Sequence, residues 1–255
     1  MQTAHLYSLA LSHPGMCTRL ALERKGVGFR LTNLIPGTHP AIVRVLGFRR
    51  NTVPALKIDG LRLQGSREIT AYLEQTRPEP PLFGRSAEER ARIEEAERWG
   101  EEELQDIPRN IFRWAAVNQP EVLVWLAGEN HFPAPGLTAR SGKPVAMLMA
   151  RASGSTPEQV RADLAALPAT LERIDALVAE GTIGGSEPNA ADMQILPTMR
   201  VLEGFGDLAP LIAGRPAMAA AERLVPQMPG PVPVRIPAEW LPQPAPDSSA
   251  AQRGR

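Results

Sequence analysis

Apolar and polar residues alternate differently in the two parts of this chain. Up to about residue 83, apolar runs, turn signals and amphipathic stretches follow one another in the order strand, helix, strand, irregular loop, hairpin, helix. Beyond the proline-rich segment 79–84, which we interpret as a stiff linker, the apolar spacing is helical throughout. We therefore expect an α/β domain over residues 1–78, an all-helical domain over 85–228 and a proline-rich C-terminal tail over 229–255.

Capping signals mark the helices of the second part. Ser86 and Glu89 form a capping box, and the helix that they begin is expected to break or kink near Pro108. Residues 131–143 are rich in proline, glycine and serine, so we expect a loop there, over the cleft between the domains. The remaining helices are expected at about 109–117, 120–130, 144–152, 157–180, 190–203, 207–213 and 215–225.

A second capping box lies at Asn189 and Asp192. A helix with a regular apolar face follows it, so the pair caps an amphipathic helix. We interpret Asp192 as a structural residue that anchors this helix, not as a chemical one.

The stretch 51–69 carries the main chemical signal. Pro54 lies at the entry to a strand, where a proline removes a hydrogen-bond donor, and a cis bond before it would resolve this conflict. The amide and carbonyl of Val53 would then be free to pair with a ligand backbone. A hairpin turn at Asp59-Gly60 follows.

Ser66 and Arg67 open the helix after this hairpin. We expect Ser66 to be its N-cap. The first amides of the helix, the Ser66 hydroxyl and the Arg67 guanidinium would together hold a carboxylate of a ligand. The alternative is an ordinary hairpin followed by an ordinary cap.

Taken in order, these motifs resemble the thioredoxin-like domain of glutathione S-transferases. The matching elements are Leu6–Leu11, Ser12-His13-Pro14, a helix from Thr18 to Gly26, Val53-Pro54-Ala55-Leu56, Asp59-Gly60 and Ser66-Arg67. The resemblance implies a thioredoxin-like N-terminal domain followed by an all-helical, glutathione-transferase-type C-terminal domain. It also implies a homodimer that binds glutathione or another low-molecular-weight thiol, together with a small-molecule electrophile.

Ser12 is the residue to which the resemblance assigns catalysis. In serine-type transferases the serine of a Ser, any residue, Pro pattern donates a hydrogen bond to the thiol sulfur and favours the thiolate. A thiol with a pKa near 8.5 is mostly protonated at neutral pH, so each unit of lowering raises the nucleophile roughly tenfold. The alternative is that Ser12 only caps the helix, although one hydroxyl can serve both purposes.

His13, next to Ser12, is a second catalytic candidate, as an acid or a base, and a role as a ligand to a metal-containing cofactor is a further alternative for it. His39 and His131 have similar loop settings and weaker claims. No histidine has partners at metal-ligand spacing, so we expect no metal site.

Three other residues near the start of the chain are weaker candidates. Some transferases use a tyrosine of the first strand, but the matching position here is Ser8, and a one-residue offset turns Tyr7 to the opposite face. We expect Tyr7 in the core and keep Ser8 as a secondary candidate. Cys17 lies within the first helix and is expected to be a small buried residue without redox chemistry.

Gly65 departs from the family pattern. The family usually has an acidic residue here, which contacts the γ-glutamyl ammonium group of glutathione. Without it, that ammonium would be desolvated without a partner, at a cost on the order of a few kcal/mol. The resemblance therefore implies a thiol site that binds glutathione weakly, and the neighbouring Arg44, Arg49 and Arg50 would suit a more anionic thiol.

Composition narrows the class of protein. The formal net charge of zero gives no bulk electrostatic basis for a nucleic-acid partner. No apolar run approaches the roughly 18 residues of a membrane span, and the N-terminus lacks the layout of a signal peptide. One cysteine allows no internal disulfide. We expect a cytoplasmic protein with no nucleic-acid or membrane partner.

Charge also bears on assembly. Residues 1–80 hold 11 lysines and arginines against 5 acidic residues, whereas the helix from Ser86 is rich in glutamate. In the family's dimer these two regions meet across the two-fold axis, so opposite charges would favour the pair.

We thus expect thiol conjugation, isomerisation or elimination on an apolar electrophile lodged near Phe112, Trp114 and the 131–143 segment. A non-catalytic binding protein with a degenerate thiol site is the first alternative. A thiol-independent enzyme that uses His13 is the second.

Overall fold

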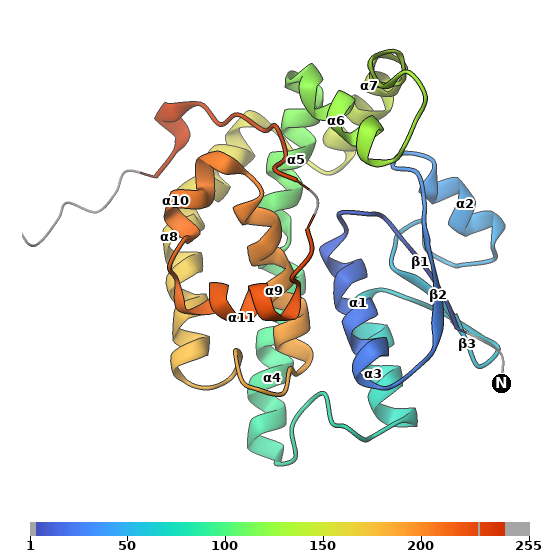
Figure 1. The fold of residues 1–255 in the computed structure, drawn as a ribbon, viewed down its shortest axis with the longest axis vertical. Helices are drawn as coiled ribbons and strands as arrows, with labels where there is room; N and C mark the ends of the chain where they lie inside the picture. Colours follow the sequence, from blue (N-terminus) through green and yellow to red (C-terminus); the bar gives the residue numbers. More distant parts are fainter. Residues whose placement is uncertain (1–3, 229, 243–255) are drawn as a thin grey trace, which may run out of the picture.

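The computed structural model describes residues 4–228 and 230–242, which form a four-stranded sheet with its helices and then a helical bundle (Figure 1). The strands are β1 (Ala4–Ser8), β2 (Phe29–Asn33), β3 (Ala55–Ile58) and β4 (Leu61–Gln64), in the order β2-β1-β3-β4. β2 is parallel to β1, and β3 is antiparallel to both β1 and β4. With α1 (His13–Arg24) between β1 and β2 and α3 (Ser66–Thr76) after β4, this is the thioredoxin-like domain that the sequence predicts.

The alternation of side chains along β1 gives the sheet two buried faces. Leu6 packs into the main core with residues of α1 and α3. Its neighbour Tyr7 lies in a separate cluster that includes Val43 of α2 (His39–Val45). Figure 1 shows α1 and α3 on one side of the sheet and α2 on the other. This two-sided burial follows from the period of two along a strand.

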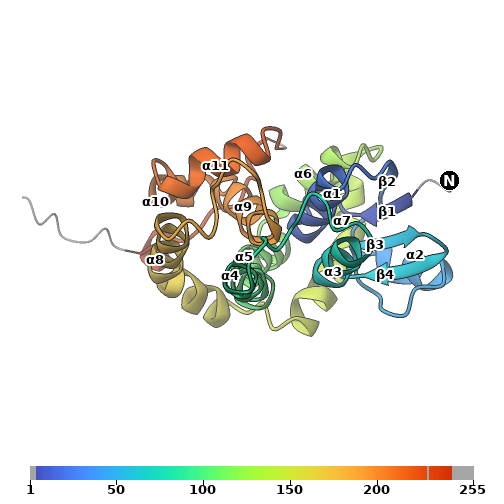
Figure 2. The same cartoon turned by 90° about the horizontal axis from the view of Figure 1, so that it is seen from below.

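The second part of the chain is all-helical, as predicted, and α9 lies at its centre. α9 packs against α1, α4 and α11, so it joins the bundle to the sheet domain (Figure 2). The described elements are α4 (Ala87–Trp99), the π-helical turn η1 (Gly100–Leu104), α5 (Asp106–Asn118), α6 (Pro120–Glu129), α7 (Pro135–Ala152), α8 (Pro157–Ala179), α9 (Ala190–Glu203), η2 (Gly206–Leu208), α10 (Ala209–Ile212), α11 (Pro216–Leu224) and η3 (Ala238–Trp240).

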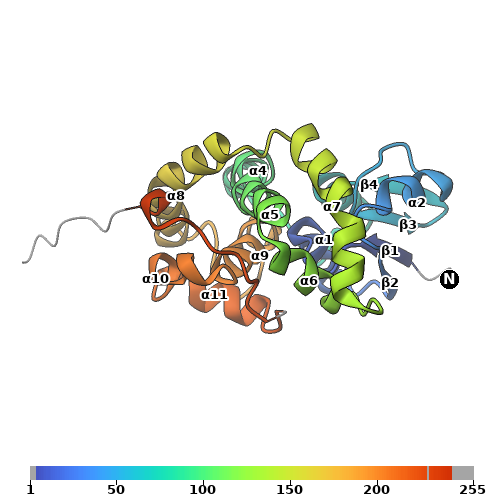
Figure 3. The ribbon, with the colours of Figure 1, turned by 90° about the horizontal axis from the view of Figure 1, so that it is seen from above.

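The break expected near Pro108 is present, as η1 and a turn at Gln105, since a proline in a helix disturbs the carbonyl four residues before it. One expectation about these helices is wrong. The expected loop at 131–143 is largely the first half of α7, which begins with Pro135 and continues past Pro144. Figure 3 shows α7 lying over the end of the sheet domain near α2.

The capping box at the start of α9 is confirmed. The Asn189 side chain accepts hydrogen bonds from the amides of Ala191 and Asp192, and Asp192 Oδ2 accepts from the Asn189 amide at 2.9 Å. The second oxygen of Asp192 accepts from the Gly184 amide at 2.6 Å. Burial raises the pKa of the Asp192 carboxyl. Both of its oxygens are engaged by backbone amides, which supports the structural interpretation.

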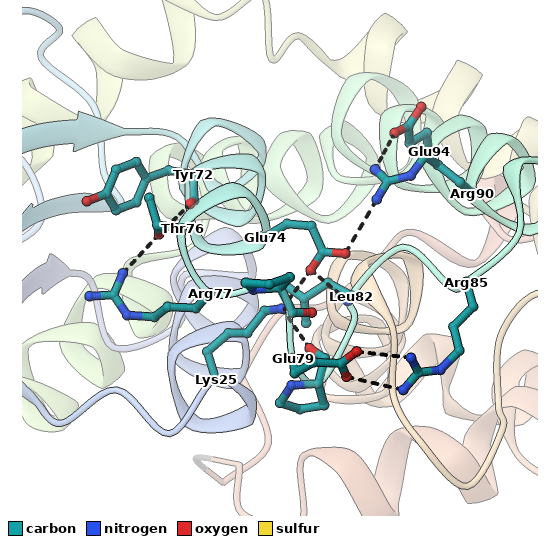
Figure 4. Close-up of polar contacts among 12 residues, drawn as sticks. Lys25, Tyr72, Glu74, Thr76, Arg77, Glu79, Leu82, Arg85, Arg90 and Glu94 are labelled. Atoms are coloured by element: carbon teal, nitrogen blue, oxygen red, sulfur yellow. Dashed lines mark hydrogen bonds and ion pairs between the residues drawn. The ribbon is translucent and has the colours of Figure 1, made fainter.

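Lys25 fastens the linker between the two parts (Figure 4). Its side chain is fully buried, and Nζ donates to Glu74 Oε2 at 2.6 Å and to the carbonyls of Pro78 and Pro80 at 3.2 and 2.6 Å. Glu74 Oε2 also accepts from the Leu82 amide at 3.0 Å. One buried ion pair therefore holds the end of α1, the end of α3 and the linker together.

Residues 230–242 run back along the helical bundle. Val232 bridges to Phe205, and Trp240 lies against Trp114 with 5.0 Å between ring centroids. The rest of the expected tail, residues 243–255, lies outside the described residues. Among the helices that the structure describes, none is both long and apolar enough to span a membrane.

Candidate functional site

A cavity of about 1330 Å³ lies between the sheet domain and the helices. The sheet domain contributes the segment after β1, the segment leading into α2, and the residues just before Pro54. The helical part contributes one face of α5, parts of α6 and α7, the end of α9 and the chain after α11. The principal lining residues are Leu9–Pro14, Ile35–His39, Thr52, Val53, Pro108, Arg109, Phe112, Arg113, Leu126, Phe132, Ala139, Val145, Met149, Arg200, Glu203 and Val232.

Ser12 lies on the wall of this cavity as the N-cap of α1. Its Oγ accepts a hydrogen bond from the Gly15 amide at 3.1 Å. A hydroxyl has two lone pairs and one proton, so this capping bond uses one lone pair and leaves the O–H free to donate. The same hydroxyl can therefore cap the helix and donate to a ligand in the cavity.

His13 also lines the cavity, but most of its ring is buried. Nδ1 lies 2.9 Å from Thr198 Oγ1, and the Thr198 hydroxyl donates to the Gln194 carbonyl at 3.4 Å. Nδ1 is thus engaged by Thr198, and Nε2 has no hydrogen-bond partner among the described residues. Burial, with the charges of Arg109 and Arg113, holds the pKa of His13 well below its usual range. His13 is therefore held neutral, and the same lowered pKa makes it a weak base.

Val53 brings main-chain groups to the same cavity. The Val53–Pro54 peptide bond is cis. Within the described part of the chain, the Val53 amide and carbonyl make no hydrogen bond. Pro54 is buried, and its carbonyl accepts from the Gly65 amide at 3.0 Å, so it supports the strand and does not line the cavity. Val53 therefore offers a free donor and a free acceptor to a ligand.

Ser66 and Arg67 do not line this cavity. The expectation that Ser66 is the N-cap of α3 is wrong: Gly65 occupies that position, and Ser66 is the first helical residue. Ser66 Oγ donates to Glu101 Oε1 at 3.4 Å. Arg67 forms ion pairs with Glu97 at 3.4 Å, Glu102 at 3.5 Å and Glu101 at 3.9 Å. Carboxylates of the same chain thus engage the Ser66 hydroxyl and the Arg67 guanidinium, two of the donors that the sequence assigned to a ligand carboxylate.

Glu97 is a residue of this cluster that sequence reasoning missed. It is 3% exposed, and Thr70 Oγ1 donates to it at 2.7 Å. Burial raises the pKa of Glu97 to about 7, against the opposing effects of Thr70 and Arg67. The sequence of α4 does not distinguish Glu97 from its neighbouring glutamates, because a run of glutamates on a helix usually lies in solvent.

The backbone at Gly65 explains part of its departure from the family pattern. Gly65 has φ 95° and ψ 140°, a region that L-residues with a side chain rarely adopt. A Cβ added there would point at the Arg50 guanidinium, whose nearest nitrogen would be 3.5 Å away. A glutamate at this position would therefore pay backbone strain before it could contact a ligand.

The weaker candidates near β1 lie outside the cavity lining. Tyr7 is buried and stacks on His5 with 4.1 Å between ring centroids, as a core residue. Ser8 is buried on the other face and donates to the Leu9 carbonyl at 3.3 Å. A Cβ built on Gly15 would lie 1.9 Å from Ser8 Oγ, so glycine is needed where α1 crosses β1. Cys17 is fully buried, and burial raises the pKa of its thiol well above the usual range.

Of the two aromatic residues expected near the electrophile, only one lines the cavity. Phe112 lines the cavity, whereas Trp114 is buried against Trp240 and does not. The 131–143 segment does line the cavity, through Phe132 just before α7 and through Ala139 in the helix itself. Arg44, Arg49 and Arg50 line a separate, smaller hollow between α2 and residues 49–52.

Arg109 and Arg113 are cavity residues that sequence reasoning did not single out. Arg109 pairs with Asp106 at 3.1 Å and also contacts Gln105. Arg113 is half-buried one turn further along α5, on the same face as Phe112 and Ala116. The spacing 109, 112, 113 and 116 is the face of one helix, and this sequence signal was available.

Comparisons with known proteins agree with this geometry. Residues 6–81 match the family model described as glutathione S-transferase, N-terminal domain. A search of curated proteins gives no match. Among solved structures, a glutathione S-transferase from Rhodospirillum rubrum F11 superposes with TM-score 0.59 and 20% identity, over 93% of this chain and 98% of that one.

Two further solved structures are informative. The beta-etherase LigF from Sphingobium sp. strain SYK-6 superposes with TM-score 0.63 and 18% identity, over 89% of this chain and 96% of that one. Glutathione S-transferase-I bound with lactoylglutathione superposes with TM-score 0.59 and 16% identity, over 89% of this chain and 100% of that one. At these identities the likeness establishes the fold.

Proposed function

We propose that this chain is a glutathione S-transferase superfamily protein, because residues 6–81 match that family's N-terminal domain and the fold agrees, and that it binds a small thiol beside Ser12 and an apolar electrophile in the adjoining cavity. One observation carries the proposal: the Ser12 hydroxyl and the main chain of Val53 line the same large, mainly apolar cavity as α5 and α7. The reaction is thiol conjugation, or thiol-assisted isomerisation or elimination.

Ser12 stabilises the thiolate in this mechanism. Its free O–H donates to the sulfur, at the N-terminal end of α1, where the helix dipole also favours negative charge. In conjugation the thiol releases its proton to solvent, a sulfur–carbon bond forms, and the leaving group departs with its bonding electrons. The neutral His13 lines the same wall, but its lowered pKa makes it a poor proton acceptor, which favours release of the thiol proton to solvent.

The thiol ligand is glutathione or another low-molecular-weight thiol, and we expect glutathione itself to bind weakly. Gly65 lacks a carboxylate for the γ-glutamyl ammonium group, while Glu101 and Glu97 already engage Ser66 and Arg67. A reduced thiol ligand is a reason to place the protein in the cytoplasm, in line with its free Cys17. We also propose a homodimer, on the family's pattern of assembly.

Calorimetric titration with glutathione, cysteine and coenzyme A tests the thiol site directly. Turnover is then measured with the thiol that binds best and 1-chloro-2,4-dinitrobenzene as electrophile. Ser12→Ala is expected to lower this turnover by roughly one to three orders of magnitude, as for the loss of a donor to a developing anion.

Ser86→Ala is the matched control, because Ser86 is also an N-cap, with its Oγ 3.1 Å from the Glu89 amide, and lies far from the cavity lining. Both variants lose a cap, at about 1 kcal/mol, but only Ser12→Ala should lose turnover. Ser12→Thr keeps a hydroxyl and should retain most activity. Equal turnover in Ser12→Ala and the wild type would refute the role of Ser12.

A non-catalytic ligand-binding protein is the second candidate. The observation that favours it is the occupation of Ser66 and Arg67 by glutamates of the same chain, which leaves a partial thiol site. Absence of binding by all three thiols, together with binding of apolar ligands to the cavity, would favour this candidate over the transferase.

A further inference from the structure

The cavity holds a charged group that has no counterpart in the described structure. Arg113 of α5 lines the cavity and is half-buried. Burial and the nearby charge of Arg109 lower the pKa of its guanidinium. Among residues 4–228 and 230–242, no side chain forms an ion pair with Arg113, and no group accepts a hydrogen bond from it.

The other cavity arginines are satisfied. Arg109 pairs with Asp106, and Arg200 pairs with Glu203 and donates to the Val225 carbonyl at 3.1 Å. Glu203 is the one acidic residue among the described residues that line the cavity, and its carboxylate forms an ion pair with Arg200. Arg113 is therefore a cavity cation without an ion-pair partner among the described residues. The carboxylate whose charge reaches it, Asp106, already pairs with Arg109, so an anion that enters the cavity would supply a partner.

His39 gives an independent sign on the opposite wall. It is the first residue of α2, lines the cavity and is 8% exposed, so more than nine-tenths of it is buried. Its Nδ1 has no hydrogen-bond partner among the described residues. His39 and Arg113 line the same cavity, and burial lowers the pKa of His39, as does the positive charge of Arg113. The Nδ1 atom of His39 is also closed to solvent, so Nε2 is the ring nitrogen open to the cavity, and in the neutral Nε2–H form it is a donor without an acceptor among the described residues.

We propose that the cavity takes an apolar carboxylic acid, whose carboxylate is held by Arg113 on α5 and His39 on α2. A guanidinium offers two parallel N–H donors to a carboxylate, and the imidazole adds a third donor from the other domain. The apolar body of the ligand lies against Phe112, Phe132 and Val145. The inference rests on the proposed function only in that this ligand occupies the place given there to the electrophile.

A matched pair of fluorescent probes tests the proposal without any thiol. 1-Pyrenebutyrate and 1-pyrenebutanol share a carbon skeleton and differ in the carboxylate. At pH 7 the wild type should bind the acid about tenfold to a hundredfold more tightly than the alcohol, as for hydrogen bonds to a charged group.

Arg113→Met should reduce this preference to less than about threefold, and His39→Phe should reduce it by about threefold to tenfold. Arg92→Met is the control, since Arg92 is an exposed arginine of α4 paired with Glu88 at 3.1 Å, and it should keep the full preference. Thermal unfolding separates this role from a structural one. Without ligand, Arg113→Met should be at least as stable as the wild type, because it removes a cation that has no ion-pair partner among the described residues.

Equal affinity of the two probes for the wild type would overturn the proposal. So would a preference that survives Arg113→Met, a loss of stability in that variant, or failure of both probes to bind. Because no thiol is present in this assay, these outcomes are independent of the glutathione titration and of Ser12→Ala.

Discussion

Replacing Lys25 by methionine should destabilise this protein more than the loss of an ordinary surface charge. Lys25 Nζ contacts Glu74 Oε2 at 2.6 Å and two linker carbonyls, and its side chain is fully buried (Figure 4). Methionine has a similar length and apolar stem, so the change removes the charge with little change in packing. The variant leaves Glu74, whose side chain is 11% exposed, without its closest cation.

The magnitude follows from the partners that remain. Removing one member of a buried ion pair typically costs about 3–5 kcal/mol, because the other charge stays buried without compensation. Here Glu74 keeps the Leu82 amide at 3.0 Å and the more distant Arg90 at 3.5 Å. We therefore expect the low end of that range, about 3 kcal/mol, which is a large fraction of a typical total stability.

Urea unfolding, followed by tryptophan fluorescence and by far-ultraviolet circular dichroism, measures this loss, and coincident curves justify two-state treatment. Arg85→Ala is the control in the same linker. Arg85 pairs with Glu79 at 3.0 Å, but the two side chains are 73% and 66% exposed, so its loss should cost less than about 1 kcal/mol. A cost for Lys25→Met below that of Arg85→Ala would refute the idea that Lys25 fastens the linker.

Three further changes give distinct results. Glu97→Gln keeps an acceptor for Thr70 and removes a carboxyl whose pKa in the folded protein, about 7, exceeds the usual 4.5. The stability of the wild type therefore falls as the pH rises between these two values. Urea unfolding should show the variant roughly 3 kcal/mol more stable than the wild type at pH 8 and nearly equal to it at pH 4.5. Gly65→Ala should lower stability by roughly 1–3 kcal/mol because of its φ of 95°, whereas Gly128→Ala in α6, where an added Cβ meets no neighbour within 4 Å, should not lower it; chemical denaturation compares the two. Asp192→Ala strands the amides of Gly184 and Asn189 and should cost about 2–4 kcal/mol by thermal unfolding, while a loss under 1 kcal/mol would contradict its structural role.

The thioredoxin-like half was predictable because its signals are local. The hairpin at Asp59-Gly60 and the helix after Ser12 each depend on a few adjacent residues. The capping box at Asn189 and Asp192 is local in the same way. The error at 131–143 arose because proline and glycine were counted as helix breakers, whereas Pro135 occupies a first turn, where proline is tolerated.

The polar groups of the site were harder to predict, because their partners lie far away in the sequence. The engagement of Arg67 by Glu97 joins residues 30 apart, and that of Ser66 by Glu101 joins residues 35 apart. No local pattern distinguishes these glutamates from those of a solvated helix face. The same holds for Arg113, since its lack of a partner is a property of the folded cavity and not of the residues around it in the chain.

These two features together indicate where this chain accepts negative charge. At the start of α3, Arg67 faces three glutamates, so a ligand carboxylate arriving there would meet occupied donors and a net acidic surrounding. At α5, Arg113 faces an apolar cavity without a carboxylate of its own. An anion therefore binds more favourably at Arg113 than at Arg67, because Arg113 has no ion-pair partner among the described residues until the anion arrives, whereas Arg67 already has three. If both inferences hold, the chain combines a serine beside the thiol sulfur with an anion site that belongs to the second ligand, and selectivity for an acidic electrophile would replace selectivity for glutathione.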